Sequence, residues 1–352
     1  MRFAKKFSVI LSALVVLSSA IAAPSQAAEL ACASTKTAAK PLGTLKVAGQ
    51  LTQLPSVKWG IEQGCFKKYG LDIETTVVAT TQIGAAGLVG GSYDVSITTP
   101  LNLFLANANE NFSGVIVAPR HGYTPQELTR AKIQPFFPNE LLLQTALIVG
   151  KGSSIPVDGW KDLEGKKVAI QSFLSSDHAG TSIAMTKFGA DYRRVEFLTL
   201  TSQQMGDALA RGNIDAAIVN DPFATQIVLG GGKVIGYPNA YFAEPGSKND
   251  ASVAVVYASL SSITTAKRKA FKAFQSATLE INKLLNNPAN EVSYRKTIQD
   301  FTGVTAAAAA KVRLPYMIER NIVADDVSYI PKKLFKIGFT KKKITAIPAI
   351  FR

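Results

Sequence analysis

The sequence repeats one pattern at a distance of 121 residues, and this repeat constrains the fold more than any other feature. The segment 46–97 aligns with the segment 167–218, and ten of the 52 aligned positions are identical. The match begins with Lys46-Val47-Ala48-x-Gln50 against Lys167-Val168-Ala169-x-Gln171. Such a repeat predicts two similar half-structures, whether they arose by duplication or by convergence of two lobes on one fold.

Both copies alternate β-branched runs with helical patterns, which predicts an α/β fold with parallel βαβ units. In the first copy we expect strands at 45–50, 73–78 and 95–98. One helix is expected from Pro55 to Gly70, with Val57, Ile61 and Cys65 on one face, because Pro suits a first turn and Gly ends a helix. A shorter helix capped by Thr80 or Thr81 should follow and close at 90–91.

The second copy repeats this plan, with strands expected at 167–171, 195–200 and 216–220. A helix is expected at 177–187, and a second helix should start at a capping box formed by Thr201 and Gln204. The segment 119–138 shows no clear period and is interpreted as a crossing or hinge. A strand at 142–149 then enters the second lobe.

The apolar run 252–257 is expected to return the chain to the first lobe, which helices at 265–285, 293–300 and 306–319 complete. The domain prediction is therefore an N-terminal arm at 29–43, a first lobe formed by 44–119 and 246–352, and a second lobe formed by 120–245. Both lobes should be doubly wound α/β units joined by a hinge.

The N-terminus has the features of a cleaved signal peptide. Arg2, Lys5 and Lys6 precede an uncharged apolar run at 7–23, and a small-residue site ends at Ala27. We expect cleavage near Ala27 or Ala28, so that residues 1–28 are removed and the protein acts in the periplasm or on the outer face of the cytoplasmic membrane. A retained N-terminal anchor is the alternative.

The chain has two cysteines, Cys32 and Cys65. An oxidising compartment would permit one bridge between them, which would tie down the N-terminal arm. Two unpaired thiols are equally compatible with the sequence. Lipidation of Cys32 is a further alternative, although the preceding Glu29-Leu30-Ala31 differs from the usual lipoprotein pattern.

The sequence is basic, with a formal net charge of +14 at pH 7. Removing the three basic residues of the leader leaves 36 basic against 25 acidic residues, or +11. Such a charge steers an anionic ligand or holds a protein near anionic lipid or cell wall. Nucleic-acid binding is not expected, because no aromatic-studded basic motif is present.

In open α/β sheets a ligand binds beyond the carboxyl ends of the strands. The repeat therefore predicts that the ligand site is formed by the loops that follow these strands in the two copies. The loops at these positions are rich in neutral hydrogen-bonding side chains, which together with helix N-termini hold an anion. The candidate ligand-binding residues are Gln50, Gln53, Leu54, Thr80, Thr81, Gln82, Thr99, Gln171, Ser172, Ser175, Ser176, His178, Asn220 and Asp221.

Each candidate also has a purely structural interpretation. Thr80, Thr81 and Thr201 suit ordinary helix caps, and Asp221 suits a turn. Gln50 and Gln171 favour ligand contact, because a long amide at the end of an apolar strand needs partners for both its oxygen and its nitrogen. Asp221 would repel an anion unless it pairs with an arginine or with a cationic part of the ligand.

No enzymatic template fits the sequence. It contains no G-x-S-x-G elbow, no H-E-x-x-H, no P-loop and no cysteine cluster for zinc. Its two histidines, His121 and His178, have no partners at a recognisable catalytic spacing. We therefore expect a protein without catalytic residues, metal or cofactor.

The placed motifs resemble the substrate-binding proteins of ABC importers in the sulfonate, nitrate, taurine and thiamine-precursor branch (the NMT1/THI5-like family). The resemblance covers 45–338 and is carried by G-C-F-K-K-Y-G-L-D-I-E at 64–74, L-x-x-G-x-x-D at 88–94, D-L-E-G-K-K-V-A-I at 162–170 and G-N-I-D-A-A-I-V-N-D-P-F at 212–223. It implies a type II periplasmic-binding fold that closes on a small molecule and docks on a permease with its ATPase. It also implies a monomer that contacts the membrane only at its surface.

The resemblance places ligand contacts on Gln50, Gln53, Thr81, Ser172, His178 and Asn220, and the serine-rich loop at 172–178 is similar to oxyanion-binding members. The Trp- and Tyr-rich first loop expected for stacking a pyrimidine is replaced by Gln50-Leu51-Thr52-Gln53-Leu54. We therefore expect a small sulfonate, taurine, nitrate or related oxyanion, with a thiamine-precursor pyrimidine as the alternative. A binding module that reports to a sensor kinase is a further alternative.

Overall fold

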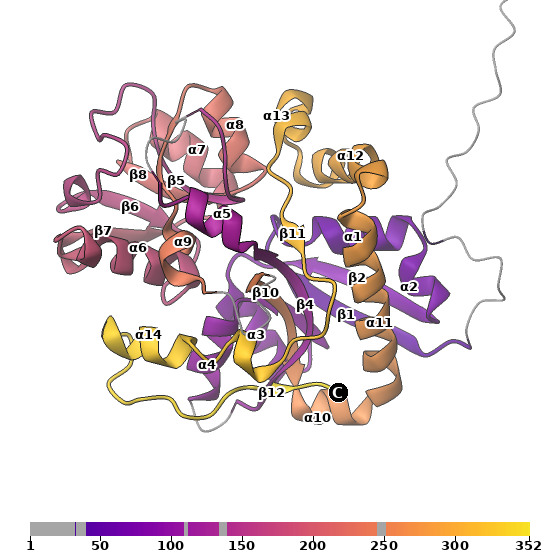
Figure 1. The fold of residues 1–352 in the computed structure, drawn as a ribbon. Helices are drawn as coiled ribbons and strands as arrows, with labels where there is room; N and C mark the ends of the chain where they lie inside the picture. The colour runs from indigo at the N-terminus through magenta and orange to yellow at the C-terminus, as the bar shows by residue number, and fades with distance from the viewer. Residues whose placement is uncertain (1–31, 33–39, 109–111, 134–138, 245–250) are drawn as a thin grey trace, which may run out of the picture.

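The computed structural model describes residue 32 and residues 40–108, 112–133, 139–244 and 251–352. Figure 1 shows two mixed β-sheets, each flanked by helices, which we call the sheets of the first and the second lobe. The predicted signal peptide and most of the predicted N-terminal arm lie outside the described residues. Within the described residues, no helix is both long and apolar enough to cross a membrane.

The first lobe is built on a sheet in the order β11-β4-β10-β3-β1-β2, with β12 pairing β4. Its strands are β1 (Gly43–Gly49), β2 (Leu71–Val77), β3 (Val95–Thr98), β4 (Gly114–Tyr123), β10 (Ser252–Leu260), β11 (Tyr316–Met317) and β12 (Ala349–Ile350). The helices that accompany it are α1 (Pro55–Glu62), α2 (Cys65–Lys68), α3 (Thr81–Val89), α4 (Pro100–Asn107), α10 (Ser261–Ala266), α11 (Arg268–Leu285) and α12 (Glu291–Thr302).

The second lobe is built on a sheet in the order β7-β6-β8-β5-β9. Its strands are β5 (Thr145–Val149), β6 (Lys167–Ile170), β7 (Glu196–Thr199), β8 (Ala216–Asn220) and β9 (Lys233–Gly236). Its helices are α5 (Pro125–Arg130), α6 (Ser176–Lys187), α7 (Ser202–Ala210), α8 (Phe223–Leu229) and α9 (Pro238–Phe242).

The sequence repeat is preserved in the strand register. Val47 pairs with Val95 between β1 and β3, and the residues 121 positions later, Val168 and Ala216, pair between β6 and β8. The aspartate before the third strand repeats as well. A carboxylate oxygen of Asp94 accepts a hydrogen bond from the backbone N–H of Lys46 at 3.0 Å, and Asp215 does the same for Lys167 at 2.8 Å. Two similar half-structures are therefore confirmed.

Two predicted helices are wrong in extent. The helix expected from Pro55 to Gly70 is split into α1 and α2, because Gly64 adopts a left-handed conformation with φ of 74°. The helix expected at 306–319 stops at Lys311, at the end of α13 (Ala306–Lys311). The chain is then extended, with Pro315 ahead of the short strand β11, and proline cannot continue a helix.

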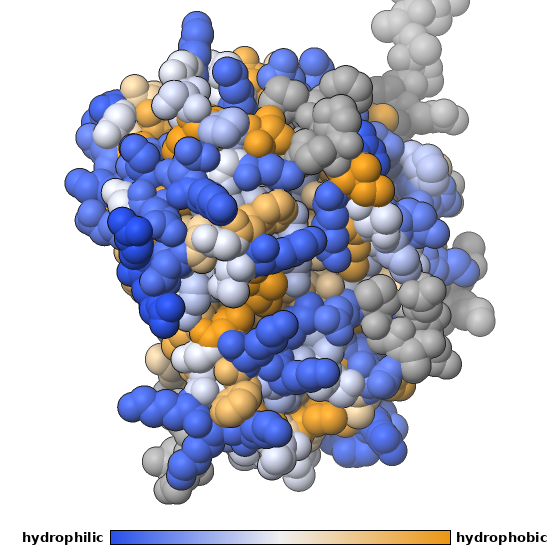
Figure 2. All heavy atoms as spheres, turned by 60° about the vertical axis from the view of Figure 1, so that its left-hand side comes forward, coloured by the Kyte–Doolittle hydropathy of each residue, from blue (hydrophilic) through white to orange (hydrophobic). Residues whose placement is uncertain are grey.

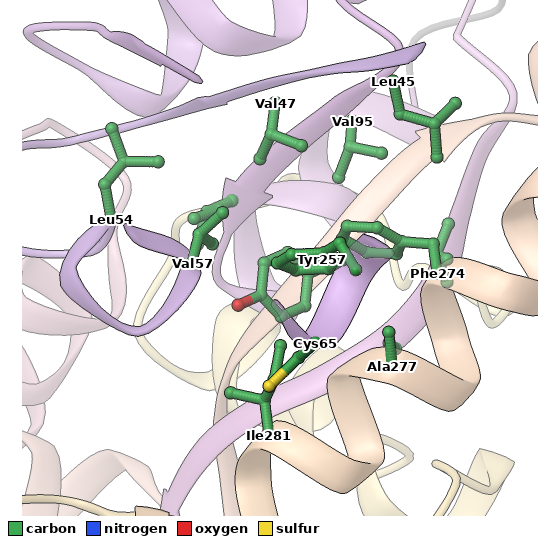
Figure 3. Packing of buried hydrophobic residues seen from close by; sticks show 14 of the residues in the cluster. Leu45, Val47, Leu54, Val57, Cys65, Val95, Tyr257, Phe274, Ala277 and Ile281 are labelled. Carbon is green, nitrogen blue, oxygen red and sulfur yellow. The ribbon is translucent and has the colours of Figure 1, made fainter. Parts of the chain in front are cut away.

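The core of the first lobe lies between its sheet and α11. Figure 3 shows Phe274, Ala277 and Ile281 of α11 facing strand residues that include Val47 and Val95. The spacing of three and four residues places these side chains on one face of α11. Burying Phe274 completely contributes about 2–3 kcal/mol.

Cys32 and Cys65 form a disulfide. This resolves the alternatives left open by the sequence in favour of the bridge. The bond joins the arm to α2, beside the buried Phe66. The sulfur of Cys32 is thereby used in the bridge, which excludes a lipid thioether at the same atom.

The C-terminal segment contacts both lobes. Helix α13 packs against α8 of the second lobe, and β12 pairs in parallel with β4 of the first lobe. Helix α14 (Ile330–Lys336) contributes Ile330 and Leu334 to a core cluster that joins Phe104 of α4 to Phe242 of α9. The two lobes are thus held together by more than the two crossings of the chain between them.

Candidate functional site

A small buried cavity of about 50 Å³ lies where loops of the two sheets meet. Residues of both lobes line it: Gln50, Thr52, Gln53, Thr81, Thr99, Asn102, Arg120, His121, Tyr123, Gln144, Thr145, Gln171, Ser172, Ser175, Ser176, Asp177, Asn220, Asn239, Ala254 and Val255. The lining is mostly amide, hydroxyl and charged side chains. A cavity of this kind between two α/β sheets is the expected position of a ligand site.

The structure brings most of the predicted site residues together at this cavity. Those that line it are Gln50, Gln53, Thr81, Thr99, Gln171, Ser172, Ser175, Ser176 and Asn220. Several of them are also bound to one another. Asn220 donates from Nδ2 to the side-chain oxygen of Gln171 at 2.5 Å, and its own oxygen accepts from the hydroxyl of Thr145.

Gln50 is held at the end of β1 by two bonds. Its Nε2 donates to the backbone carbonyl of Ala79 at 3.0 Å, and its backbone N–H donates to the side-chain oxygen of Gln53 at 3.0 Å. The amides of this first loop are therefore fixed in orientation before a ligand arrives, which lowers the entropic cost of binding.

The other five predicted residues lie outside the cavity lining. Leu54 is buried in the core of the first lobe, and Thr80 caps α3 by accepting from the backbone N–H of Ile83 at 3.3 Å. Gln82 reaches across to the second lobe, where its Nε2 donates to the carbonyl of Phe173 at 3.0 Å. His178 and Asp221 have their own partners, described next.

His178 packs among aromatic side chains behind the serine-rich loop. Its ring centroid lies 4.6 Å from that of Phe197 and 4.7 Å from that of Phe339. Burial lowers the pKa of His178 to about 4, so the imidazole is neutral. Its Nδ1 then accepts a hydrogen bond from the backbone N–H of Leu174 at 3.2 Å. His178 thus supports the loop rather than lining the cavity.

Asp221 is buried and accepts hydrogen bonds from backbone groups, and the charge of Arg295 also acts on it. One carboxylate oxygen accepts from the N–H of Thr225 at 2.8 Å, and the other accepts from the N–H of Arg313 at 2.6 Å. Burial raises the pKa of this carboxyl to about 7, against the opposing effect of these bonds. Asp221 therefore fixes the start of α8 to the chain that follows α13.

Arg120 on β4 is the principal residue that sequence reasoning missed. Its side chain is buried, its Nε donates to the hydroxyl of Ser56 at 3.0 Å, and its Nη1 is hydrogen-bonded to Nδ1 of His121. The guanidinium forms no ion pair with any residue that the structure describes. A buried charge without a counter-charge is costly, and an anionic ligand would offset that cost.

His121 is a neutral partner of this arginine. Burial, and then the charge of Arg120, lower the pKa of His121 well below its usual range. The imidazole therefore accepts a hydrogen bond at Nδ1 and adds no charge. The positive charge at this part of the cavity belongs to Arg120.

Four buried polar atoms of lining residues have no hydrogen-bond partner within the described parts of the chain. They are Oγ1 of Thr52, Nη2 of Arg120, Oγ of Ser172 and Oδ1 of Asn239. Buried polar groups are normally hydrogen-bonded, because an unpaired one loses its hydrogen bonds to water without forming a bond within the protein. Their grouping around one cavity indicates a place built for a polar ligand.

Helix N-termini add positive potential at the cavity. Thr81 is the first residue of α3, Thr99 is the N-cap of α4, and Ser175 and Ser176 begin α6. Unpaired N–H groups and the helix dipole favour negative charge at such ends. Three helices therefore start where Arg120 contributes its charge.

The cavity also contains one carboxyl group. Asp177 is buried and accepts a hydrogen bond from Nδ2 of Asn239 at 3.1 Å. Burial raises the pKa of Asp177 to about 6, although the bond from Asn239 lowers it. The charge of the cavity therefore changes with pH near neutrality.

A second hollow of about 200 Å³ shares Gln50, Thr52 and Gln171 with the cavity. It continues along residues 77–79 and 201–203 and contacts the aromatic ring of Phe223. This hollow provides space next to the cavity for a larger and less polar part of a ligand.

Comparison with known proteins assigns the chain to a family. The sequence profile described as the NMT1-like family matches residues 42–299. The chain belongs to the NMT1-like family. At the level of sequence, no curated protein matches this NMT1-like protein.

Solved structures share its fold. The alkanesulfonate-binding protein SsuA from Xanthomonas axonopodis pv. citri, bound to MOPS, superposes with a TM-score of 0.68 at 17% identity, covering 90% of this chain and 100% of SsuA. The periplasmic nitrate-binding protein NrtA from Synechocystis PCC 6803 gives 0.60 at 13% identity, covering 85% and 82%. The desulfurization enzyme DSZB gives 0.55 at 10% identity, covering 86% and 94%. The NMT1-like protein therefore has the periplasmic-binding-protein fold expected from its sequence.

Proposed function

We propose that this protein is an extracytoplasmic solute-binding protein that closes on a small oxyanion and delivers it to an ABC importer. One observation carries the proposal: the buried guanidinium of Arg120, which has no acidic partner among the described residues and whose Nη2 is unsatisfied, lies at a cavity where three helices begin. This combination favours an anion whose charge is spread over several oxygens, as in a sulfonate or nitrate.

The size of the cavity supports a small ligand. One water needs about 10–15 Å³ on the same measure, so about 50 Å³ accommodates only a few heavy atoms. This fits nitrate or the head group of a sulfonate, and the adjoining hollow has room for the tail of an alkanesulfonate. SsuA and NrtA, which share the fold, are named for these two ligand classes.

A pyrimidine fits less well. The aromatic rings that line the cavity are those of His121 and Tyr123, and they contact each other edge to face, with centroids 6.4 Å apart. His121 is also bound to Arg120. This arrangement leaves no pair of parallel rings to sandwich a planar base.

We propose a binding role without catalysis. The residues that line the cavity include neither cysteine nor lysine, and its histidine is engaged with Arg120. No cluster of metal-ligating side chains occurs among the described residues. DSZB has the same fold, so turnover must be measured directly.

We further propose the domain division 44–119 with 246–352 as the first lobe and 120–245 as the second, and a monomer secreted after cleavage near Ala27 or Ala28. The paths of β4 and β10 support a hinge near these boundaries, because the chain leaves the first sheet at the end of β4 and re-enters it at the start of β10. The contacts of α13 and α14 with the second lobe add a third connection.

The test is a ligand screen by thermal shift and calorimetry with the exported protein. Methanesulfonate, longer alkanesulfonates, taurine, nitrate, bicarbonate and a thiamine-precursor pyrimidine are compared. A true ligand at 100 times its Kd stabilises the fold by about 2.7 kcal/mol. Stabilisation by the pyrimidine alone, or conversion of any compound to a product, would contradict the proposal.

A further inference from the structure

The last part of the chain, residues 327–352, is strongly basic and carries no acidic residue. Residues 327–352 contain six lysines and one arginine, and neither aspartate nor glutamate. Most of these lysines are exposed: Lys332, Lys336, Lys341, Lys342 and Lys343. Lys333 differs, because it is half-buried and its Nζ donates to the carbonyl of Tyr241 at 3.1 Å.

Two contacts join this segment into one continuous surface with its neighbours. Nζ of Lys343 lies 5.8 Å from the ring centroid of Phe335, so the loop after α14 runs back beside that helix. Arg268 lies 5.5 Å from the ring of Phe351 and donates from Nη2 to the carbonyl of Arg352 at 2.9 Å. The end of the chain is thereby fixed to the start of α11.

The start of α11 extends the same charge. Lys267, Arg268, Lys269 and Lys272 are exposed there, and residues 251–279 also lack aspartate and glutamate. In Figure 1, α14, β12 and α10 lie along one lower edge of the molecule. We call this surface, formed by 332–352 and 267–272, the basic face.

Acidic side chains that border the basic face already have cationic partners. Asp94 accepts from Nζ of Lys267 at 2.7 Å, Glu244 pairs with Lys333 at 2.8 Å, and the buried Asp326 pairs with Arg320 at 2.7 Å. These pairs leave the lysines at 341–343, Lys332 and Lys336 without neutralisation by these acids, so the net field of the face is positive.

Apolar side chains stand between the exposed lysines. Phe335 is 44% exposed and Ile347 is 38% exposed. Figure 2 shows hydrophilic side chains projecting from the lower part of the molecule, with hydrophobic residues between them. Lysines on flexible stems around a few exposed apolar groups are typical of surfaces that bind at a membrane interface.

We propose that the basic face binds the anionic phospholipid surface of a membrane. Lys341, Lys342 and Lys343 line a hollow of about 730 Å³, but the positive charge continues beyond it to Lys332, Lys336 and the start of α11. A charge that extends over such a wide face suits many headgroups better than one small anion. Each lysine near an anionic bilayer adds attraction that weakens with salt. Docking of this kind keeps the binding protein close to a membrane-embedded importer, and it does not require that the cavity be filled.

Co-sedimentation with lipid vesicles tests this proposal, using protein purified from the exported fraction of expressing cells. Vesicles of phosphatidylcholine alone are compared with vesicles that also contain phosphatidylglycerol, at low and at high salt. The protein should sediment with the anionic vesicles only, and high salt should release it. Replacing Lys341, Lys342 and Lys343 with Gln should weaken this binding by about 100-fold.

The matched control replaces Lys151, Lys161 and Lys233, which are exposed on the second lobe, with Gln. It removes the same charge and should bind nearly as well as the parent protein. Equal loss in both variants, or equal binding to neutral and to anionic vesicles, would overturn the proposal. The thermal shift with ligand should be unchanged in both variants, so this test is independent of the proposed function.

Discussion

The side-chain amide of Asn102 donates a hydrogen bond to the backbone carbonyl of Leu174, 3.2 Å away, and this bond crosses from the first lobe to the second. Gln82 makes a parallel bond to the carbonyl of Phe173 at 3.0 Å. Leu174 adopts a left-handed conformation with φ of 55°, which is unfavourable for a branched side chain. The two amides therefore hold a strained loop of the second lobe against the first lobe.

Removing this contact should favour the open arrangement. The Asn102→Ala variant, combined with Gln82→Ala, should bind the ligand about 10-fold more weakly, mainly through faster dissociation, because the closed state loses two hydrogen bonds. Stopped-flow dissociation rates provide the measurement. Asn290→Ala is the control, because Asn290 makes a similar bond to the carbonyl of Leu284 within the first lobe. Unchanged dissociation in the double variant would show that these bonds do not restrain the lobes.

Anion affinity should fall as the pH rises. Burial raises the pKa of Asp177 from 3.8 to about 6, so the carboxyl is mostly neutral below that pH and ionised above it. The negative charge then repels the ligand, and Kd for methanesulfonate should increase by about 10-fold between about pH 5 and about pH 7.5. His121 stays neutral over this range, since its pKa is lowered well below its usual value. Calorimetry at several pH values checks this, and Asp177→Asn should remove the slope.

The buried histidine of the second lobe should contribute to acid sensitivity. Burial lowers the pKa of His178 from 6.5 to about 4, so the unfolded chain takes up a proton before the folded protein does. The contribution of His178 to the free energy of unfolding is therefore fully present above about pH 6.5. It is lost as the pH falls toward 4, by a total of about 3 kcal/mol.

His178→Asn isolates this contribution, because Asn keeps an acceptor for the N–H of Leu174 and does not titrate. Asp177 and Asp221, whose raised pKa values act in the opposite direction, are present in both proteins. Urea unfolding from pH 7 to pH 4 should give a shallower decline for the variant. Parallel curves would mean that His178 does not carry the effect.

The disulfide should be important for stability. It closes a loop with a sequence separation of 33 residues, and the chain-entropy model gives a stabilisation of about 3–4 kcal/mol for such a loop. The double variant Cys32→Ala, Cys65→Ala should unfold at correspondingly lower urea concentration while keeping its ligand affinity. Stability equal to that of the parent protein would contradict this estimate.

The repeat made the central strands and the site loops predictable. The offset of 121 residues predicts that the two copies have the same order of strands and loops. The strand pairing agrees with this, because Val47 pairs with Val95 and the residues 121 positions later, Val168 and Ala216, also pair. The helix N-caps were also predictable from the sequence, because the groups that bind one another are only three residues apart. Thr80 binds the N–H of Ile83, and Gln204 binds the N–H of Thr201.

The rest of the site depends on contacts between distant segments, which local patterns do not reveal. The prolines in 119–138 suggested an irregular crossing, yet residues up to Tyr123 belong to strand β4. Arg120 and His121 were hidden in this segment. An arginine two residues after the apolar run at 115–118, with Pro119 between them, was the available signal, since a charge inside a buried strand usually has a function.

The interpretation of this protein as an anion-binding protein rests on Arg120, and one binding measurement tests it. Calorimetry with methanesulfonate and nitrate is carried out on the parent protein, on Arg120→Gln and on Arg211→Gln, whose side chain is exposed on the second lobe. We predict that Arg120→Gln lowers anion affinity by about 100-fold or more, while it remains folded by circular dichroism, and that Arg211→Gln binds as the parent does. Undiminished anion binding by folded Arg120→Gln would contradict the account.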